Sequence, residues 1–264
     1  MSRTRSASPP VWVGILALIG LVFLALPIAG LALEAPWSQV GSQLVDPTIA
    51  HALELSLGAS LMATSLSVLL GVPLAWALAR MELPARSWVR GIVTLPLVLP
   101  PVVGGVALLL ALGRIGLIGR PLNDLLGITL FGTPAAVVIA ETFVAMPFLV
   151  IAVEGALRTT DRRYEEAAAT LGARPGRIFT RVTLPLIAPS LGAGAVLAWA
   201  RALGEFGATI TFAGNLPGST QTVPLAVYVE LQHNLDGAIS LSLVLVGVSL
   251  GVLVVLRDRW MRAL

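Results

Sequence analysis

The chain has 264 residues, of which 56% are hydrophobic and 12% are charged, and its net charge is +3. This composition excludes an ordinary soluble domain and indicates a membrane protein. The chain has no cysteine, which excludes disulfides and thiolate chemistry. The arginines lie in short loops between apolar runs instead of on one basic stripe, so we expect no nucleic-acid partner.

Sequence patterns typical of catalysis are missing from this chain. His51 and His233 lie far apart and lack the spacing of metal ligands. There is no phosphate-binding loop, no nucleophile elbow and no HExxH motif. We therefore expect no metal, no cofactor and no catalytic residue in the chain itself.

Six apolar runs are long enough to cross a bilayer as helices, which takes about 20 residues. They are residues 11–33, 53–79, 91–112, 134–157, 186–212 and 237–256. The first run is longer than a signal-peptide core and no cleavage site follows it, so we expect it to be retained. Val223–Leu231 is too short to cross and is expected at the outer surface or dipping partly into the bilayer. The sequence predicts an all-α polytopic membrane protein with one transmembrane domain over residues 1–264.

The third run is rich in residues that break helices, namely Pro96, Pro100, Pro101, Gly104 and Gly105. Prolines remove backbone hydrogen bonds, so we expect a loosened helix in the middle of the membrane. Such a break is tolerated where the backbone is buried in protein or lines a cavity. A kink for packing and a break for a transport pathway both fit. Residues 113–133 then form a Gly-rich, mildly polar connection.

The basic residues indicate the orientation of the spans. All are arginines, and with six spans and an inner N-terminus most of them fall on the inner side. The inner arginines are Arg3, Arg5, Arg80, Arg86, Arg90, Arg158, Arg162, Arg163, Arg174, Arg177, Arg181, Arg257, Arg259 and Arg262. Arg114 and Arg120 fall outside and Arg201 lies within a span. By the positive-inside rule, both termini and the loop of residues 158–185 are predicted to be cytoplasmic.

This central loop (residues 158–185) is the one long polar interruption of the sequence. Asp161 or Thr160 can cap a short helix whose apolar face falls at helical spacing. That face comprises Tyr164, Ala167, Ala168 and Leu171. Gly172 is placed to end the helix in a left-handed conformation, and Pro175 suits the start of a second short helix. We expect this second helix to stop at Pro185.

The central loop also carries a recognisable spacing. Glu166-Ala167-Ala168 is followed by three residues and Gly172, then by nine residues and Val182-Thr183-Leu184-Pro185. This pattern resembles the loop by which permease subunits of bacterial ABC importers dock onto their ATPase, with Val182 where Ile is usual. The resemblance implies a type I ABC importer permease fold with a cytoplasmic coupling helix. It implies ATPase-coupling roles for Glu165, Glu166, Ala167, Ala168, Leu171, Gly172 and Pro185.

A second stretch narrows the resemblance. Residues 201–228 read RALGEFGATITFAGNLPGSTQTVPLAVY and are similar to molybdate ABC importer permeases, as is ETFVAMPFLV at residues 141–150. Sulfate permeases share the RAxGEFG part, and the molybdate family usually has Gln where this chain has Glu141. The resemblance implies a bacterial inner-membrane homodimer with two ATPases and an extracytoplasmic binding protein. It implies import of molybdate or tungstate, with sulfate or thiosulfate as the alternative.

The charges inside the spans allow two interpretations. A charge in mid-span costs roughly 2.5 to 3.5 kcal/mol, so it is seldom turned toward lipid. Arg201 and Glu205 are four residues apart and can pair on one helix. They either line an anion pathway together with Thr209, Thr211 and Asn215, or form a structural pair that locks the fifth span.

The other two intramembrane acids suggest a rival function. Glu141 and Glu154 are unhelpful to an anion, and we expect them to pair with an arginine or to lie near an interface. A membrane-embedded enzyme could use them with Arg201 and Glu205 as acid and base groups, but nothing supplies a nucleophile. A passive channel is a further alternative, which leaves the docking motif unexplained.

Overall fold

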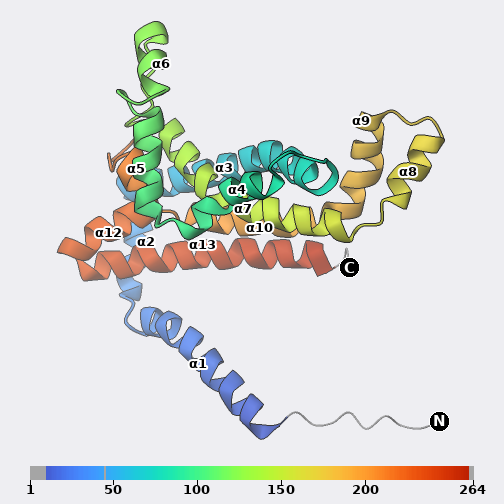
Figure 1. Ribbon diagram of the computed structural model, residues 1–264. Helices are drawn as coiled ribbons and strands as arrows, with labels where there is room; N and C mark the ends of the chain where they lie inside the picture. Colours follow the sequence, from blue (N-terminus) through green and yellow to red (C-terminus); the bar gives the residue numbers. More distant parts are fainter. Residues whose placement is uncertain (1–9, 45, 262–264) are drawn as a thin grey trace.

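The computed structural model describes residues 10–44 and 46–261, and every regular element in these two ranges is a helix (Figure 1). The prediction of an all-α protein is confirmed. Five of these helices are long and apolar enough to cross a membrane, and a bent pair makes a sixth if it is counted as one span. Arg3, Arg5 and Arg262 lie outside the described residues.

The N-terminal part contains α1 (Val11–Leu33), α2 (Trp37–Leu44) and α3 (Pro47–Arg80). The bounds of α1 are those of the first predicted span, and Figure 1 shows this helix standing apart from the helical body. Helix α3 begins at Pro47 instead of the predicted residue 53. The reason is a local cap, because Oδ1 of Asp46 accepts a hydrogen bond from the backbone N–H of Thr48 at 2.8 Å.

The third predicted span is two helices, α4 (Arg86–Val98) and α5 (Pro101–Leu112), bent by 119°. The break is sharper than the loosened helix that was expected. Leu99 precedes a proline and adopts an extended backbone, which ends α4. The connection that follows also differs from the prediction, since it contains a short helix, α6 (Gly119–Leu126), that projects from one end of the molecule (Figure 1).

The core is formed by α3 packed against α7 (Pro134–Thr159) and α10 (Leu184–Leu203). Small residues let these helices approach closely. A Cβ at Gly71 would lie 3.0 Å from the Leu149 side chain, and one at Gly194 would lie 3.0 Å from Cβ of Ala152. The tight contact explains why the middle of α7 is the most deeply buried of the candidate spans.

The prediction that the second short helix of the central loop stops at Pro185 is wrong. After α8 (Arg163–Thr170), the chain is helical from α9 (Pro175–Ile178) through a π-helical turn, η1 (Phe179–Thr183), into α10. A proline inside an α-helix normally clashes with the preceding turn. Here the wider turn, in which the N–H of Leu184 bonds to the carbonyl of Phe179, lets the chain pass Pro185 without a break.

The fifth predicted span, residues 186–212, is also divided. Helix α10 ends at Leu203, and a short helix, α11 (Gly207–Phe212), follows. The carboxylate of Glu205 accepts a hydrogen bond from the N–H of Ala208 at 2.7 Å and so starts α11 separately. The chain ends with α12 (Val223–His233), which covers the segment predicted to be too short to cross, and α13 (Leu235–Met261).

Candidate functional site

Polar features of the chain gather at the two ends of the helical body. Figure 1 shows α8, α9 and the C-terminal end of α13 together at one end, and α6 and α12 at the other. Ion pairs bring Arg80, Arg90 and Arg158 to the end that carries α8, each from a different helix. The segregation of arginines that the sequence predicted along the chain is therefore also a segregation in space.

The central loop forms the predicted elbow between two helices. Gly172 adopts a φ of +79°, the left-handed conformation that favours glycine, and α9 starts at Pro175. Tyr164 on α8 is 59% exposed, and Leu171, which follows the last residue of this helix, is 88% exposed. An exposed apolar face on a short helix is the feature expected of a surface that a partner covers.

The two adjacent acids of α8 have different surroundings. Oε1 of Glu165 accepts a hydrogen bond from Oγ1 of Thr183 at 3.0 Å and lies 3.4 Å from Nη2 of Arg80. Nη2 of Arg162 also donates to the carbonyl of Ala79 at 3.3 Å. Glu166 is exposed. Glu165 therefore ties the elbow to the end of α3 and to the π-helical turn, whereas Glu166 remains available to a partner.

The second half of the elbow packs onto the helical body. The rings of Phe179 and Trp76 meet edge to face at 6.2 Å, which joins the π-helical turn to α3. Pro185 is exposed on α10, beyond the elbow, so it is separated from the other predicted coupling residues. The sequence did not indicate the contacts of Arg80 and Thr183 with Glu165, because they join residues distant in the chain.

Glu154 confirms the prediction that it pairs with an arginine. Its Oε1 accepts from Nε of Arg158, one helical turn along α7, at 3.1 Å, and it also contacts Nη2 of Arg90 on α4. Glu154 and Arg158 are four residues apart, so this pair could be predicted from their spacing on a helix. The contact with Arg90 joins α4 to α7.

The predicted pair of Arg201 and Glu205 is present. Nη2 of Arg201 lies 2.5 Å from Oε2 of Glu205, and the side chain of Glu205 is 1% exposed while that of Arg201 is 27% exposed. Glu205 has a second task, because its other oxygen caps α11. The pair thus holds the break between α10 and α11, and its arginine remains partly accessible.

Of the neutral polar residues beyond this pair, Thr209 is buried and Thr211 and Asn215 are partly buried. Thr209 is buried, and its hydroxyl has no partner among the described residues. Oγ1 of Thr211 donates to the carbonyl of Gly207 at 2.7 Å, and a Cβ at Gly105 would lie 1.7 Å from that oxygen. Oδ1 of Asn215 is buried and has no partner within residues 10–44 and 46–261. Helices α5 and α11 are therefore in direct contact here.

Glu141 differs from Glu154. It is buried on α7, its Oε2 lacks a hydrogen-bond partner, and no arginine of the described ranges forms an ion pair with it. The alternative that it pairs with an arginine is therefore wrong for Glu141. Glu141 is 1% exposed and lies within α7, the most deeply buried of the candidate spans.

Comparison with known proteins agrees with this architecture. Residues 71–264 match the model of the family described as binding-protein-dependent transport system inner membrane component. The chain belongs to this family. The family resemblance that the central loop indicated is thereby confirmed, and the protein is an ABC transporter permease.

Several proteins are similar to this permease over most of their length. The molybdenum transport system permease protein ModB of Mycobacterium bovis is 50% identical over 240 residues, which are 91% of this chain and 90% of that protein. The sulfate transport system permease protein CysW of Synechococcus elongatus is 36% identical over 261 residues, which are 96% of this chain and 90% of that protein.

The fold of the permease has a solved counterpart. A chain in the crystal structure of a bacterial ABC transporter for import of the acidic polysaccharide alginate superposes with a TM-score of 0.72 and 20% identity. The match covers 96% of this chain and 95% of that one. At this identity the match supports the fold alone, which is the type I importer permease fold that the docking motif implied.

Proposed function

We propose that this permease is the membrane subunit of an ATP-driven importer that moves molybdate, and also tungstate, into the cytoplasm. The observation that carries the proposal is the 50% identity with a molybdenum transport permease over 91% of the chain. The length of the match is important, because a match over 240 of the 264 residues includes both the central loop and the segment around Arg201. The matched span therefore contains the residues that we propose to couple to the ATPase and those that we propose to border the pathway.

The proposed complex has two permease copies, two cytoplasmic ATPases and one extracytoplasmic binding protein. The exposed apolar face of α8 supports docking of an ATPase at that end. The family description, which names binding-protein-dependent transport, supports a delivery protein at the other. Helix α1 exposes apolar side chains along its whole length, as expected for a helix in contact with lipid or with a second copy.

The α8 end is proposed to face the cytoplasm of a bacterial inner membrane. Arginines are strongly biased to this end, and the positive-inside rule relates that bias to the cytoplasmic side. Both termini are placed on the same side by this proposal. ATP is available there, so the docking surface and the ATPase would meet in one compartment.

The contacts of the elbow suggest how motion of the ATPase reaches the membrane. Glu166, Ala167, Ala168 and Leu171 would contact the ATPase, and Gly172 would hold the bend. Glu165 would pass displacement of α8 to α3 through Arg80 and to the π-helical turn through Thr183. That turn leads without a break into α10, so the docking surface and the Arg201 region lie on connected helices.

The far end of α10 is proposed to border the anion pathway. Arg201 is partly exposed and would offset some of the charge of the dianion, while Glu205 limits the depth of the electrostatic well. Thr209, Thr211 and Asn215 would serve as neutral donors once α5 and α11 separate. In the described conformation these two helices are in contact, which fits a closed state of the pathway.

Uptake of labelled molybdate into vesicles containing the complete complex tests the substrate. We expect molybdate to accumulate, excess tungstate to compete, and excess sulfate or thiosulfate to compete weakly. The sulfate alternative is favoured by one observation, the 36% identity with a sulfate permease over 96% of the chain. Efficient competition by sulfate with little molybdate uptake would support that alternative instead.

A further inference from the structure

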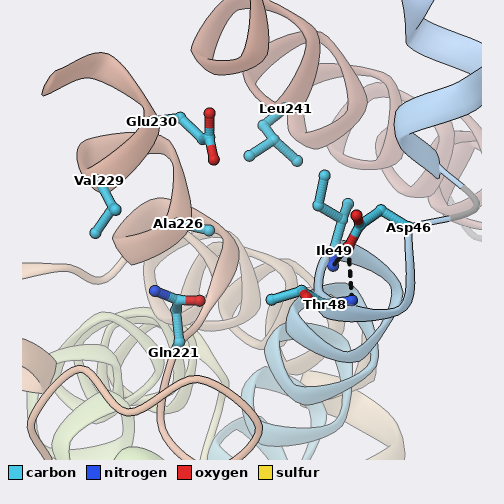
Figure 2. Close-up of a pocket in the computed structure, with 8 residues that line it drawn as sticks. All are labelled: Asp46, Thr48, Ile49, Gln221, Ala226, Val229, Glu230 and Leu241. Carbon is cyan, nitrogen blue, oxygen red and sulfur yellow. Dashed lines mark hydrogen bonds between the residues drawn. The ribbon is translucent and has the colours of Figure 1, made fainter. Parts of the chain in front are cut away.

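A polar pocket lies at the end of the molecule opposite α8. It has a volume of about 190 Å³ and is formed by the start of α3, by α12 and by α13. Figure 2 shows Asp46 and Glu230 facing it from two sides, with Ile49 and Leu241 supplying apolar walls. Since one water occupies about 30 Å³ in the liquid, the pocket has room for the end of a long side chain.

The amide of Gln221 borders the pocket. Gln221 is 9% exposed, and its side chain makes no hydrogen bond to any residue of the described ranges. Figure 2 shows this amide turned into the pocket from below α12. Because the amide makes no hydrogen bond within the described ranges, its oxygen can accept one from a ligand that enters the pocket.

The charge of the pocket selects the kind of ligand. The backbone N–H groups of Thr48 and Ile49 hold the pKa of Asp46 below its usual value, so this carboxylate is charged near neutral pH. The carboxylate of Glu230 forms no ion pair within the part of the chain that the structure describes. With two carboxylates, one amide oxygen and no basic residue in its wall, the pocket suits a cation and repels an oxyanion.

The segments around the pocket are also negatively charged. The segments at this end carry mostly acids, which favours association with a basic surface. The acids are Glu34, Asp46, Glu54, Asp124, Glu230 and Asp236, and the arginines are Arg114 and Arg120. We infer that the pocket accepts a lysine or arginine side chain of the extracytoplasmic binding protein when that protein docks. The inference rests on the proposed function, because it requires a delivery protein at this end.

The test uses the complete complex of permease, ATPase and molybdate-binding protein in lipid nanodiscs. ATP hydrolysis is measured against the concentration of binding protein. We expect Glu230→Gln and Asp46→Asn each to raise the half-maximal concentration about tenfold, as loss of one charge-assisted contact does. Asn retains the ability to cap α3. Hydrolysis without binding protein should be unchanged, and Gln221→Leu should give a smaller rise.

The matched control is Glu54→Gln, an exposed acid on the helix that Asp46 caps and outside the pocket, which should raise the half-maximal concentration much less than either pocket variant. An unchanged value in both Glu230→Gln and Asp46→Asn would overturn the inference. So would stimulation of the wild-type complex by sodium or calcium alone that Glu230→Gln abolishes, because the pocket would then hold a free cation. Failure of the wild-type complex to respond to any binding protein would contradict the proposed function itself.

Discussion

At the scale of single residues, Gly172 controls the shape of the docking elbow. Its φ of +79° costs about 1 to 2 kcal/mol for a residue with a side chain, although no neighbouring atom would touch the new Cβ. We therefore expect Gly172→Leu to distort the elbow and reduce the amount of ATPase that copurifies with the membrane complex. Gly155→Ala, on α7 with equally open space, is the control and should retain the ATPase. Normal ATPase content and transport after Gly172→Leu would argue against docking there.

Substitution of Arg201 tests whether its pair with Glu205 borders the anion pathway or only stabilises the fold. Arg201→Gln leaves Glu205 buried without its partner, which costs roughly 3 to 5 kcal/mol in comparable sites and should lower the thermal stability of the complex. Adding Glu205→Gln removes the unpaired charge, so the double variant should regain stability. If Arg201 borders the anion pathway, molybdate uptake stays low in the double variant. Recovery of uptake together with stability would make the pair structural.

Residue types and spacing were sufficient to predict the elbow, Gly172 and the pair of Arg201 with Glu205, because all of these depend on neighbours within a few positions. They were insufficient for Arg80 and Thr183, which reach Glu165 only through the packing of three helices. Glu154 shows both cases, since Arg158 was within sequence reach and Arg90 was not. Glu141 has no such partner among the described residues, and sequence gave no reason for that.

At the scale of helices, the link between α8 and α3 should separate docking from coupling. Glu165→Ala removes the contacts with Arg80 and Thr183 but leaves the exposed face of α8 intact. We expect the ATPase to remain bound and to hydrolyse ATP with little molybdate uptake. The next residue, Glu166, is exposed, and Glu166→Ala should instead weaken ATPase binding. Loss of the ATPase in Glu165→Ala and retention in Glu166→Ala would reverse these roles.

Helices α5 and α11 approach each other closely. A Cβ at Gly105 would lie 2.8 Å from the carbonyl oxygen of Ala208, which is backbone and cannot turn aside. We expect Gly105→Val to force the two helices apart at a cost of about 1 to 3 kcal/mol and to lower the melting temperature. The control is Gly104→Ala, whose Cβ would meet only the Phe143 ring at 3.1 Å. Equal melting temperatures for both variants would contradict this packing.

Several helix boundaries were predicted wrongly from the sequence. The consecutive prolines at Pro100 and Pro101 predicted a disturbance but not a bend of 119°, because the angle depends on what α5 packs against. Pro185 was expected to end a helix, and a π-helical turn accommodates it instead. The turn before Gly207 was missed because its cap, Glu205, was interpreted only as a charge partner.

At the scale of the whole molecule, the two ends have distinct chemistry. One end is rich in arginine and carries the exposed apolar face of α8, and the other carries acids and the pocket beside α12. The helical body between them is closed by close packing of α3, α7 and α10. Under the proposed function, the arginine-rich end is the surface for the ATPase and the acidic end is the surface for the binding protein.

Uptake of labelled molybdate into proteoliposomes that contain the permease, its ATPase and the binding protein tests the central claim most directly. The account predicts accumulation that requires ATP and the binding protein together, with ATP hydrolysis that falls when the permease is omitted. Accumulation without ATP would indicate a passive channel. ATP hydrolysis and molybdate uptake that stay the same when the permease and the binding protein are omitted would contradict the account.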